Sequence, residues 1–280
     1  MREIQAAAIT AAVKELCIRT NYALTPEIEQ ALHAARQRET LPRAGEILTQ
    51  LEQNLLLARE KQIPICQDTG MAVVFAELGQ EVHITGGALS EAIDEGVRQG
   101  YTQGYLRKSV VSDPIERVNT GDNTPAVIHY DVVPGDRLRL TVAPKGFGSE
   151  NMSRVFMLKP ADGAQGVMDA VLTAVRDAGP NACPPMVVGV GVGGTFEKCA
   201  LLSKHALLRQ PGSHCAVPWA REMEETLLEQ INQLGIGPAG LGGRTTAFAV
   251  NLEVYPTHIA GLPVAVNICC HVCRHGSATL

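Results

Sequence analysis

The sequence predicts an α+β fold in which a helical N-terminal region, about residues 1–62, precedes mixed or antiparallel sheets with surrounding helices. Two observations predict this class. The first sixty residues show helical apolar spacing, whereas after Pro64 helical and strand-like runs alternate without the regular βαβ order of a doubly wound sheet. No repeat, low-complexity segment or clear linker interrupts the chain, so one domain over residues 1–280 is expected.

The N-terminal region is predicted to be helical from its apolar spacing and one capping signal. Thr25 followed by Pro26 is typical of a helix N-cap and its first turn. The apolar residues at helical spacing are Ile9, Val13, Leu16 and Cys17 in a first segment, and Ile47, Leu51 and Leu55 in a later one.

The middle of the chain predicts strands around one helix. Residues 71–78 (MAVVFAEL) are expected to form a strand, and two further β-like runs, 126–133 and 137–144, are separated by Pro134-Gly135. That spacing predicts a hairpin. The apolar ridge of the intervening helix consists of Leu89, Ile93, Val97 and Tyr101.

The C-terminal half alternates helices and strands. Helices are predicted over 163–178, over 195–209, and along the ridge Met223, Leu227, Ile231 and Leu234, which ends at Gly235. Strands are predicted in the runs 184–194 (PPMVVGVGVGG), 245–254 and 262–270. A short tail is expected after the last strand.

Composition excludes several function classes. The chain is 45% hydrophobic and 19% charged, and 24 Lys+Arg against 29 Asp+Glu give a net charge of −5. Without a basic run, nucleic acid and anionic membranes are poor candidate partners, and a small anionic substrate needs locally placed arginines. No signal-peptide core is present and no stretch approaches the roughly 20 apolar residues of a membrane span, so a soluble, cytoplasmic protein is expected.

Eight cysteines are too sparse for a secreted disulfide scaffold and more than packing alone suggests. In a reducing cytosol they indicate core thiols, metal ligands or both. Cys66 stands in the loop IPICQDTG (63–70), where a thiol, an amide and a carboxylate are consecutive. The alternative interpretation is a buried core thiol followed by a plain turn.

Two further loops carry glycines or thiols. The segment 143–153 (APKGFGSENMS) offers backbone amides and Lys145 to an anion, but lacks P-loop spacing, and a capped turn is the alternative. Cys183 precedes two prolines, which fix the backbone beside the thiol. The following GVGVGG run superficially resembles a dinucleotide motif, yet no GxGxxG is in register, so nucleotide binding is not favoured.

The segment NICCHVCRH (267–275) is dense in soft ligands. Cys270 and Cys273 with His271 and His275 could form half a zinc site, but no second motif completes it. One thiolate from each of three distant loops, Cys66, Cys183 and one of the 269/270 pair, would also suit an iron–sulfur cluster with three thiolate ligands and one open iron.

Four spaced motifs together carry a resemblance to a known family. ICQDTG, PKGFGSEN, the segment from NACPP to ALLR, and the apolar run that closes on a cysteine resemble the α subunit of class I fumarate hydratases and of the related L(+)-tartrate dehydratases. The match runs from about Cys66 to Arg274, roughly three quarters of the chain, while the helical N-terminus is similar only in character.

The resemblance implies a [4Fe-4S] cluster held by Cys66, Cys183 and Cys270, the last lying seven residues after Pro263 as in the family. Four other cysteines match no ligand and are expected to be core or surface thiols: Cys17, Cys199, Cys215 and Cys273. The doublet Cys269-Cys270, followed by His271 and Cys273, is richer in ligands than the family pattern requires.

The resemblance also implies a substrate site. It places Gln67 and Asp68 beside the substrate, Arg107 on a carboxylate, the Gly148 amide in an anion-holding loop and His258 nearby. Asp68 is the expected proton donor or relay on the leaving hydroxyl group. The alternatives are an Arg107 that extends into solvent and a His258 that is an ordinary loop histidine.

In the family, the base for the carbon-bound proton and further arginines come from a second module. The resemblance therefore implies a separate β subunit, an α2β2 heterotetramer and a small dicarboxylate substrate. The GFGSEN loop is more similar to fumarases of the tricarboxylic acid cycle than to tartrate dehydratases, which carry a further cysteine there and no Ser-Glu-Asn. Fumarate and L-malate are therefore expected. The alternatives are an L(+)-tartrate dehydratase α subunit and, in a different class, a non-catalytic iron–sulfur or zinc sensor or scaffold.

Overall fold

The computed structural model describes all of residues 1–280 and confirms an α+β fold with mixed sheets. The chain forms two compact units. Unit 1 comprises Met1–Thr25, Asn54–Phe147 and Arg274–Leu280, and unit 2 comprises Pro26–Gln53 and Gly148–Cys273. The expected single domain over 1–280 stays a prediction.

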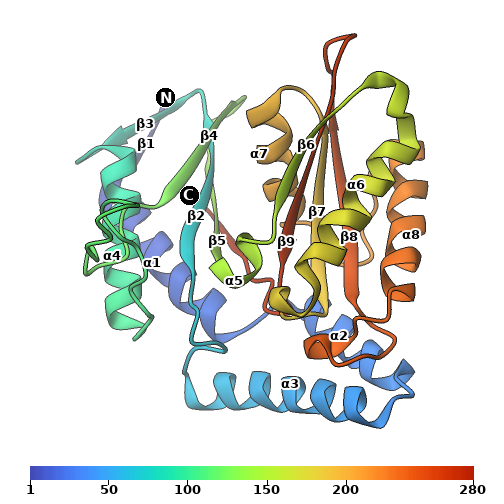
Figure 1. Ribbon diagram of the computed structural model, residues 1–280. Helices are drawn as coiled ribbons and strands as arrows, with labels where there is room; N and C mark the ends of the chain where they lie inside the picture. The colour runs from blue at the N-terminus through green and yellow to red at the C-terminus, as the bar shows by residue number, and fades with distance from the viewer. The chain divides into compact units, whose positions relative to one another are not determined.

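Unit 1 contains a four-stranded mixed sheet with strand order β10-β5-β2-β4. Figure 1 labels β2, β4 and β5 of this sheet. Its strands are β2 (Met71–Gly79), β4 (Val127–Val133), β5 (Leu138–Lys145) and β10 (Gly276–Thr279). Helices α1 (Ala6–Tyr22) and α4 (Leu89–Gln103) pack against each other, and α1 also packs on β5. The predicted ridges of both helices are buried except for Leu89, which is partly buried; the buried residues include Ile9, Val13, Ile93 and Val97. A separate parallel pair joins β1 (Arg2–Gln5) to β3 (Val82–Thr85).

The predicted hairpin of residues 126–133 and 137–144 is wrong, although both strands exist. β2 lies between β4 and β5 and pairs with the first in parallel and with the second antiparallel. The turn after β4 crosses the end of β2, where the Gly79 and Glu81 N–H groups donate to the Arg137 and Gly135 carbonyls. Because β2 is almost entirely apolar, it is stable with partners on both edges, and it displaces the local pairing.

The helical N-terminal region forms as predicted, apart from the short strand β1. α2 (Pro26–Arg38) begins at the predicted proline, and α3 (Pro42–Lys61) contains the apolar repeat of Ile47, Leu51 and Leu55. α2 and the first part of α3 belong to unit 2, whereas the end of α3 belongs to unit 1.

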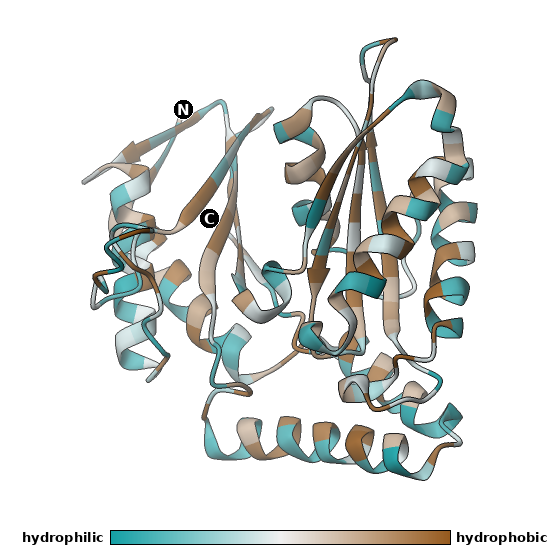
Figure 2. Ribbon diagram, in the orientation of Figure 1, coloured by the Kyte–Doolittle hydropathy of each residue, from teal (hydrophilic) through white to brown (hydrophobic).

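Unit 2 contains a second four-stranded mixed sheet, ordered β6-β9-β7-β8. Its strands are β6 (Arg154–Leu158), β7 (Met186–Gly193), β8 (Ala247–Tyr255) and β9 (Leu262–Cys269). Its helices include α5 (Phe147–Glu150), whose first residue lies in unit 1, α6 (Gly163–Ala178), α7 (Phe196–Ala206) and α8 (Pro218–Gln233). Strand β7 is fully buried. It consists of Met, Val and Gly only, and Figure 2 shows the hydropathy of the strands of this sheet. The sequence predicts all of these unit 2 strands and helices except β6 and α5. In unit 1, the residues of β10 are predicted only as a tail.

The two faces of the unit 2 sheet are covered differently. α6 and α8 share one apolar core with the sheet, whereas α7 packs against β7 and β9 (Figure 1). The alternating glycines of GVGVGG explain the close approach of α7. A Cβ at Gly189 would lie 2.1 Å from the Ser203 carbonyl oxygen, and one at Gly191 would lie 2.1 Å from that of Cys199. These glycines therefore serve helix packing.

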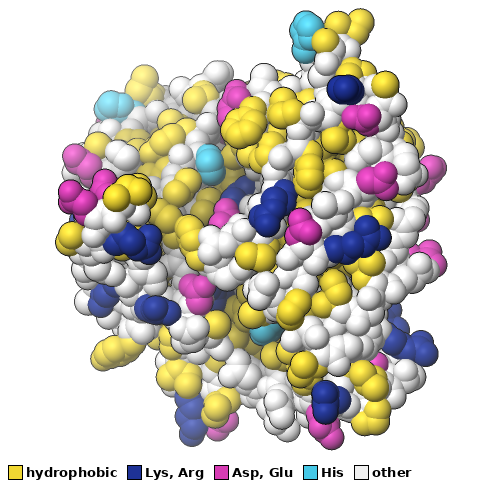
Figure 3. Space-filling view, viewed as in Figure 1, with side chains coloured by type: hydrophobic (Ala, Val, Ile, Leu, Met, Phe, Trp, Pro, Cys, Tyr) yellow, Lys and Arg dark blue, Asp and Glu magenta, His cyan; other side chains and the backbone are white.

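None of the helices is both long and apolar enough to cross a bilayer. On the part of unit 2 visible in Figure 3, acidic and basic side chains are interspersed and form no broad patch of one sign. This arrangement agrees with the mild net charge of the sequence.

Candidate functional site

The loop Cys66–Gly70 of unit 1 lies between α3 and β2 and packs against the end of β5. Gly70 has a φ of +74°, and a Cβ there would lie within 2.8 Å of three backbone atoms of Lys145. Only glycine fits this position without strain. The loop is therefore pressed onto the backbone that leads into residues 146–148.

The Asp68 carboxylate is held by backbone donors on both oxygens. The Gly70 N–H donates to Oδ1 at 3.1 Å and the Phe147 N–H donates to Oδ2 at 2.9 Å. Gly146 makes room for it, because a Cβ at that residue would stand 3.0 Å from Oδ2. The carboxylate is half-buried and has a fixed orientation, which suits a group that must hold or move a proton at one place.

Arg107 lies beside the same loop, beyond the end of α4. Its Nη1 donates to the Gln67 Oε1 at 2.8 Å, and its backbone N–H donates to the Thr69 hydroxyl oxygen at 2.9 Å. The Arg107 side chain is exposed, yet it is anchored at both its backbone and its guanidinium. The structure therefore brings together Gln67, Asp68 and Arg107, all within unit 1.

The loop Cys66–Gly70 is also held by buried residues that the sequence did not single out for the site. The Tyr101 hydroxyl lies 2.9 Å from the carbonyl oxygens of both Thr69 and Gly70, and the Asn123 amide donates to the Gly70 carbonyl at 3.2 Å. Burial is the largest of the effects that raise the pKa of Tyr101, so its hydroxyl keeps its proton and remains a donor. Tyr101 was recognised only as part of a helical ridge, and no sequence signal marked Asn123.

Cys183 and Cys270 are close neighbours in the fold of unit 2. The His271 N–H and Nδ1 lie 3.3 Å and 3.0 Å from the Cys183 carbonyl oxygen, which ties the residue after Cys270 to Cys183. Cys183 is exposed and has a φ of +51°, an unusual backbone conformation for a residue with a side chain. Such backbone strain is often found at ligand-binding positions.

The other thiols of this segment differ from Cys270 in burial. Cys269 is 5% exposed within β9, paired with β7, while Cys270 follows the strand and is half-buried. Cys273 is buried, and its Sγ donates to the Leu207 carbonyl. Cys17 and Cys199 are buried core thiols, and burial raises the pKa of Cys17 to about 12.

Gly148 opens the unit 2 part of the predicted anion-holding loop and is exposed. The Ser-Glu-Asn sequence after it has a structural function. Glu150 forms an ion pair with Lys204 of α7 and accepts a hydrogen bond from the Asn267 amide of β9. This contact fixes the loop to the unit 2 sheet.

His258 does not lie near the two unit 2 cysteines. It is exposed in the turn between β8 and β9, where its Nδ1 accepts a hydrogen bond from the Ala260 N–H. Cys270 follows the other end of β9, and eight residues at about 3.3 Å each separate the two ends by roughly 26 Å. A role for His258 at the substrate stays a prediction.

The three predicted cluster ligands are divided between the units, with Cys66 in unit 1 and Cys183 and Cys270 in unit 2. No group of three or more His, Cys, Asp or Glu side chains in the structure gathers closely enough to hold a metal ion. Their assignment as ligands therefore stays a prediction. Its chemistry fits one detail of unit 1, because the Asp68 N–H lies 3.4 Å from the Cys66 Sγ and is directed to donate to it.

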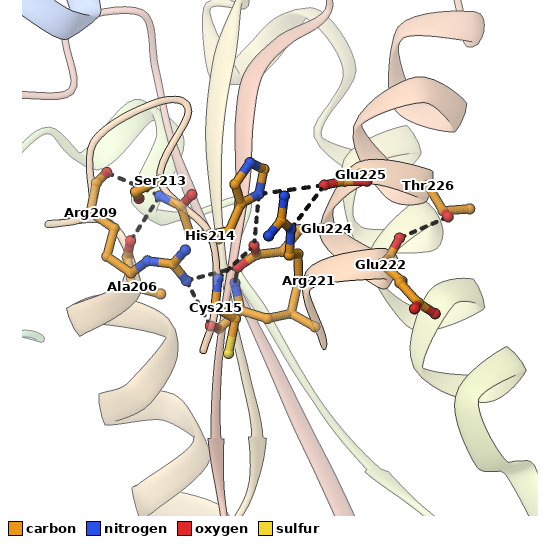
Figure 4. A network of polar contacts seen from close by, with 12 residues as sticks. Ala206, Arg209, Ser213, His214, Cys215, Arg221, Glu222, Glu224, Glu225 and Thr226 are labelled. Carbon is orange, nitrogen blue, oxygen red and sulfur yellow. Dashed lines mark hydrogen bonds and ion pairs between the residues drawn. The ribbon is translucent and has the colours of Figure 1, made fainter. Parts of the chain in front are cut away.

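A second polar network in unit 2 is structural (Figure 4). The buried Glu224 carboxylate accepts hydrogen bonds from the Arg209 Nη1 at 2.7 Å and from the backbone N–H groups of Leu252 and Cys215 at 2.7 and 3.0 Å. It ties the loop between α7 and α8 to β8, as a satisfied buried carboxylate does. This network accounts for the position of Cys215.

The chain is similar to proteins of one family along nearly all its length. Residues 10–279 match the model of a family described as fumarate hydratase (Fumerase). A Methanocaldococcus jannaschii protein, provisionally named an L(+)-tartrate dehydratase subunit alpha, is 38% identical over 253 residues, which cover 88% of each chain. The L(+)-tartrate dehydratase subunits alpha of Escherichia coli strains UTI89 and K12 are 32% and 31% identical over 255 residues, which cover 90% of this chain and 84% of each relative.

Proposed function

The chain belongs to the fumarate hydratase (Fumerase) family and is a hydro-lyase α subunit, and from this premise we propose that it works in a two-subunit [4Fe-4S] enzyme that interconverts fumarate and L-malate. The observation that carries the proposal is the anchored set of Gln67, Asp68 and Arg107 on one loop system of unit 1. A cation for a carboxylate stands there beside a fixed proton-transfer group.

Arg107 binds a carboxylate of the substrate in this proposal. Its Nη1 is engaged by Gln67, and a planar guanidinium has further N–H groups for a bidentate contact with a carboxylate. Asp68 then gives a proton to the hydroxyl group that leaves from L-malate and takes it back in the hydration direction. The two backbone N–H bonds keep its carboxylate aimed in one direction through both steps.

Cys66, Cys183 and Cys270 would hold the cluster. Three soft thiolates suit iron–sulfur chemistry, and the Asp68 N–H donates to the first of them as outer-shell donors do around cluster sulfurs. When bound, the cluster supplies a Lewis acid for the hydroxyl group.

A separate β subunit completes the enzyme in this proposal and supplies the base for the carbon-bound proton. The resemblance of the sequence to class I α subunits and the subunit names of the relatives support a partner. An α2β2 assembly in the cytoplasm is the form we propose.

The choice of fumarate and L-malate as substrates depends on the GFGSEN loop, which is more similar to the loop of fumarases than to that of tartrate dehydratases. The names of the relatives favour a second candidate substrate, L(+)-tartrate. The two substrates differ by one hydroxyl group on the carbon that loses its proton. Because Glu150 of this loop contacts α7 and β9, the loop acts on specificity by positioning the Gly148 backbone.

The test is a comparison of substrates with the anaerobically prepared complex of this chain and its β subunit. We expect kcat/KM for L-malate and fumarate to exceed that for L(+)-tartrate by at least about tenfold, the effect of about 1.4 kcal/mol in the transition state. The chain alone is the matched control and should show negligible turnover. A preference for L(+)-tartrate would identify the second candidate, and robust turnover by the chain alone would contradict the need for a β subunit.

A further inference from the structure

We propose that Arg274 is a positioning residue that fixes the Asp68 peptide group, an inference that rests on the proposed function of Asp68. Arg274 is 5% exposed and belongs to unit 1. Its Nη2 donates to the Asp68 carbonyl oxygen at 2.5 Å, and its Nε donates to the Pro144 carbonyl oxygen at 3.3 Å. One guanidinium thus joins the Cys66–Gly70 loop to the end of β5.

The charge of Arg274 is unusual because no carboxylate forms an ion pair with it. Its Nη1 is buried and has no hydrogen-bond partner. An uncompensated buried guanidinium is costly, so it is retained where its geometry is needed. Arg274 and Asp68 both act electrostatically on the buried Tyr101 hydroxyl, in opposite directions, which places the cation and the carboxylate in one neighbourhood.

Arg274 completes a set of contacts that restrains Asp68 at every polar group. The Asp68 N–H contacts the Cys66 Sγ, its carboxylate accepts from the Gly70 and Phe147 N–H groups, and its carbonyl oxygen accepts from Arg274. Without Arg274 the peptide group between Asp68 and Thr69 can rotate, and the orientation of the Asp68 carboxylate is no longer fixed. A displacement of about 1 Å at a reacting group is enough to cost about 10²-fold in rate.

The shape of the side chain matters as well as its charge. A guanidinium presents Nε and Nη2 as a rigid fork that reaches two carbonyl oxygens from different segments, whereas a lysine ammonium is a single point on a flexible stem. Arg274 also lies four residues after Cys270 in the chain. The segment that carries one predicted cluster ligand therefore ends in the residue that holds the loop carrying another.

The experiment compares Arg274→Lys, Arg274→Gln and Arg274→Ala with the wild type in two ways. The first is amide hydrogen exchange of residues 66–70 in the cluster-free chain, which needs neither substrate nor partner. We expect exchange to accelerate in all three variants. The second is steady-state kinetics of the complex, where kcat should fall about 10²-fold while KM changes by no more than about threefold, because Arg107 still binds the carboxylate.

Added guanidinium ion supplies a test that a general loss of stability would not pass. In Arg274→Ala, millimolar guanidinium should restore part of kcat and slow exchange in residues 66–70. The matched control is Arg209→Ala, which removes another largely buried arginine, in unit 2, and should lower the melting temperature without changing exchange at 66–70. Its kcat should stay at the wild-type value and should not respond to guanidinium.

The outcomes separate the two claims. If the wild-type complex converts none of the dicarboxylates, the proposed function is wrong. Hydrogen exchange alone then tests whether Arg274 fixes the Asp68 peptide group. Unchanged exchange at 66–70 in Arg274→Lys and Arg274→Gln, or an active complex whose kcat is unaffected by these changes, would overturn the proposal. If Arg274→Ala does not fold, the Lys and Gln variants decide it.

Discussion

The two units present their reactive groups in opposite ways. In unit 1 the loop Cys66–Gly70 is restrained by side chains from several segments, among them Tyr101, Arg107 and Arg274. In unit 2, Cys183 and Cys270 lie at the ends of segments flanking an apolar sheet and are joined through the backbone of His271. In the proposed function, unit 1 orients the proton-transfer group Asp68, and unit 2 presents two of the three thiols that would hold the cluster. Changes at Asp68 should therefore alter rates, and changes at Cys66, Cys183 and Cys270 should alter cofactor retention.

The largest effect, loss of the cluster and of activity, is expected from a change at Cys270. Cys269 is the last residue of β9 and is buried, whereas Cys270 follows the strand and is half-buried. Cys270→Ser should abolish cluster retention and activity, as should the corresponding changes at Cys66 and Cys183. Iron and sulfide content after anaerobic reconstitution is the measurement.

Cys269→Ser and Cys273→Ser are the matched controls. Both should retain the cluster and lose only a little packing energy. A stable, active cluster in Cys270→Ser and none in Cys269→Ser would show that the assigned ligand is displaced by one residue, and that His271 or Cys273 belongs to the site.

Asp68→Asn tests the proton-transfer role of unit 1. The amide keeps the size of the side chain but cannot donate the proton, so kcat should fall by about 10² to 10⁴-fold with the cluster intact. Steady-state kinetics with the visible absorption of the cluster as a control measures this. Turnover near the wild-type value would exclude Asp68 as the proton donor.

Arg107→Ala should act on binding. A carboxylate contact is largely kept from the ground state to the transition state, so its loss should raise KM by about 10 to 100-fold with a smaller change in kcat. Gln67→Ala, which removes the partner of the Arg107 Nη1, should give a weaker effect of the same kind. A fall in kcat alone at Arg107 would contradict this division of roles.

Gly189→Ala tests the packing of α7 on the unit 2 sheet. A Cβ there meets the Ser203 carbonyl oxygen at 2.1 Å, and a helix backbone cannot move aside cheaply, so the free energy of unfolding should drop by about 1–3 kcal/mol. Gly45→Ala in α3 is the opposite case, because nothing lies within 4 Å of its Cβ and the stability should rise by about 0.5–1 kcal/mol. Equal effects in thermal unfolding would refute the account of the GVGVGG run.

The smallest effect concerns Asp122, which precedes Asn123 in the loop that supports Gly70. Burial acts to raise the pKa of Asp122, but hydrogen bonds from Thr124 and the ion pair with Arg98 lower it from 3.8 to about 2. A lowered pKa contributes stability above pH 4 that is lost as the pH falls through 2. Asp122→Asn should thus cost about 1 kcal/mol or less at pH 7, since this pair is partly exposed, and nothing below pH 2. Chemical denaturation at the two pH values measures the difference.

The sequence predicts what depends on local spacing. The apolar ridges of α1 and α4, the strands β2, β7, β8 and β9, and the loop that brings Gln67 and Asp68 together follow from periodicity and motifs. The insertion of β2 between β4 and β5 does not follow from local spacing. Strand pairing depends on which residues, far apart in the chain, are buried together. For the same reason the roles of Asn123 and Arg274 at the loop were missed. Their contacts join residues separated by 53 and 206 positions.

The most direct test of the cluster assignment is the metal and sulfide content of the chain after anaerobic reconstitution with iron and sulfide. We expect about four iron and four acid-labile sulfide per chain, lost together on exposure to air because the iron without a thiolate is open to oxidants. Zinc without acid-labile sulfide, or no bound metal at all, would contradict the assignment of Cys66, Cys183 and Cys270 as the ligands of a cluster.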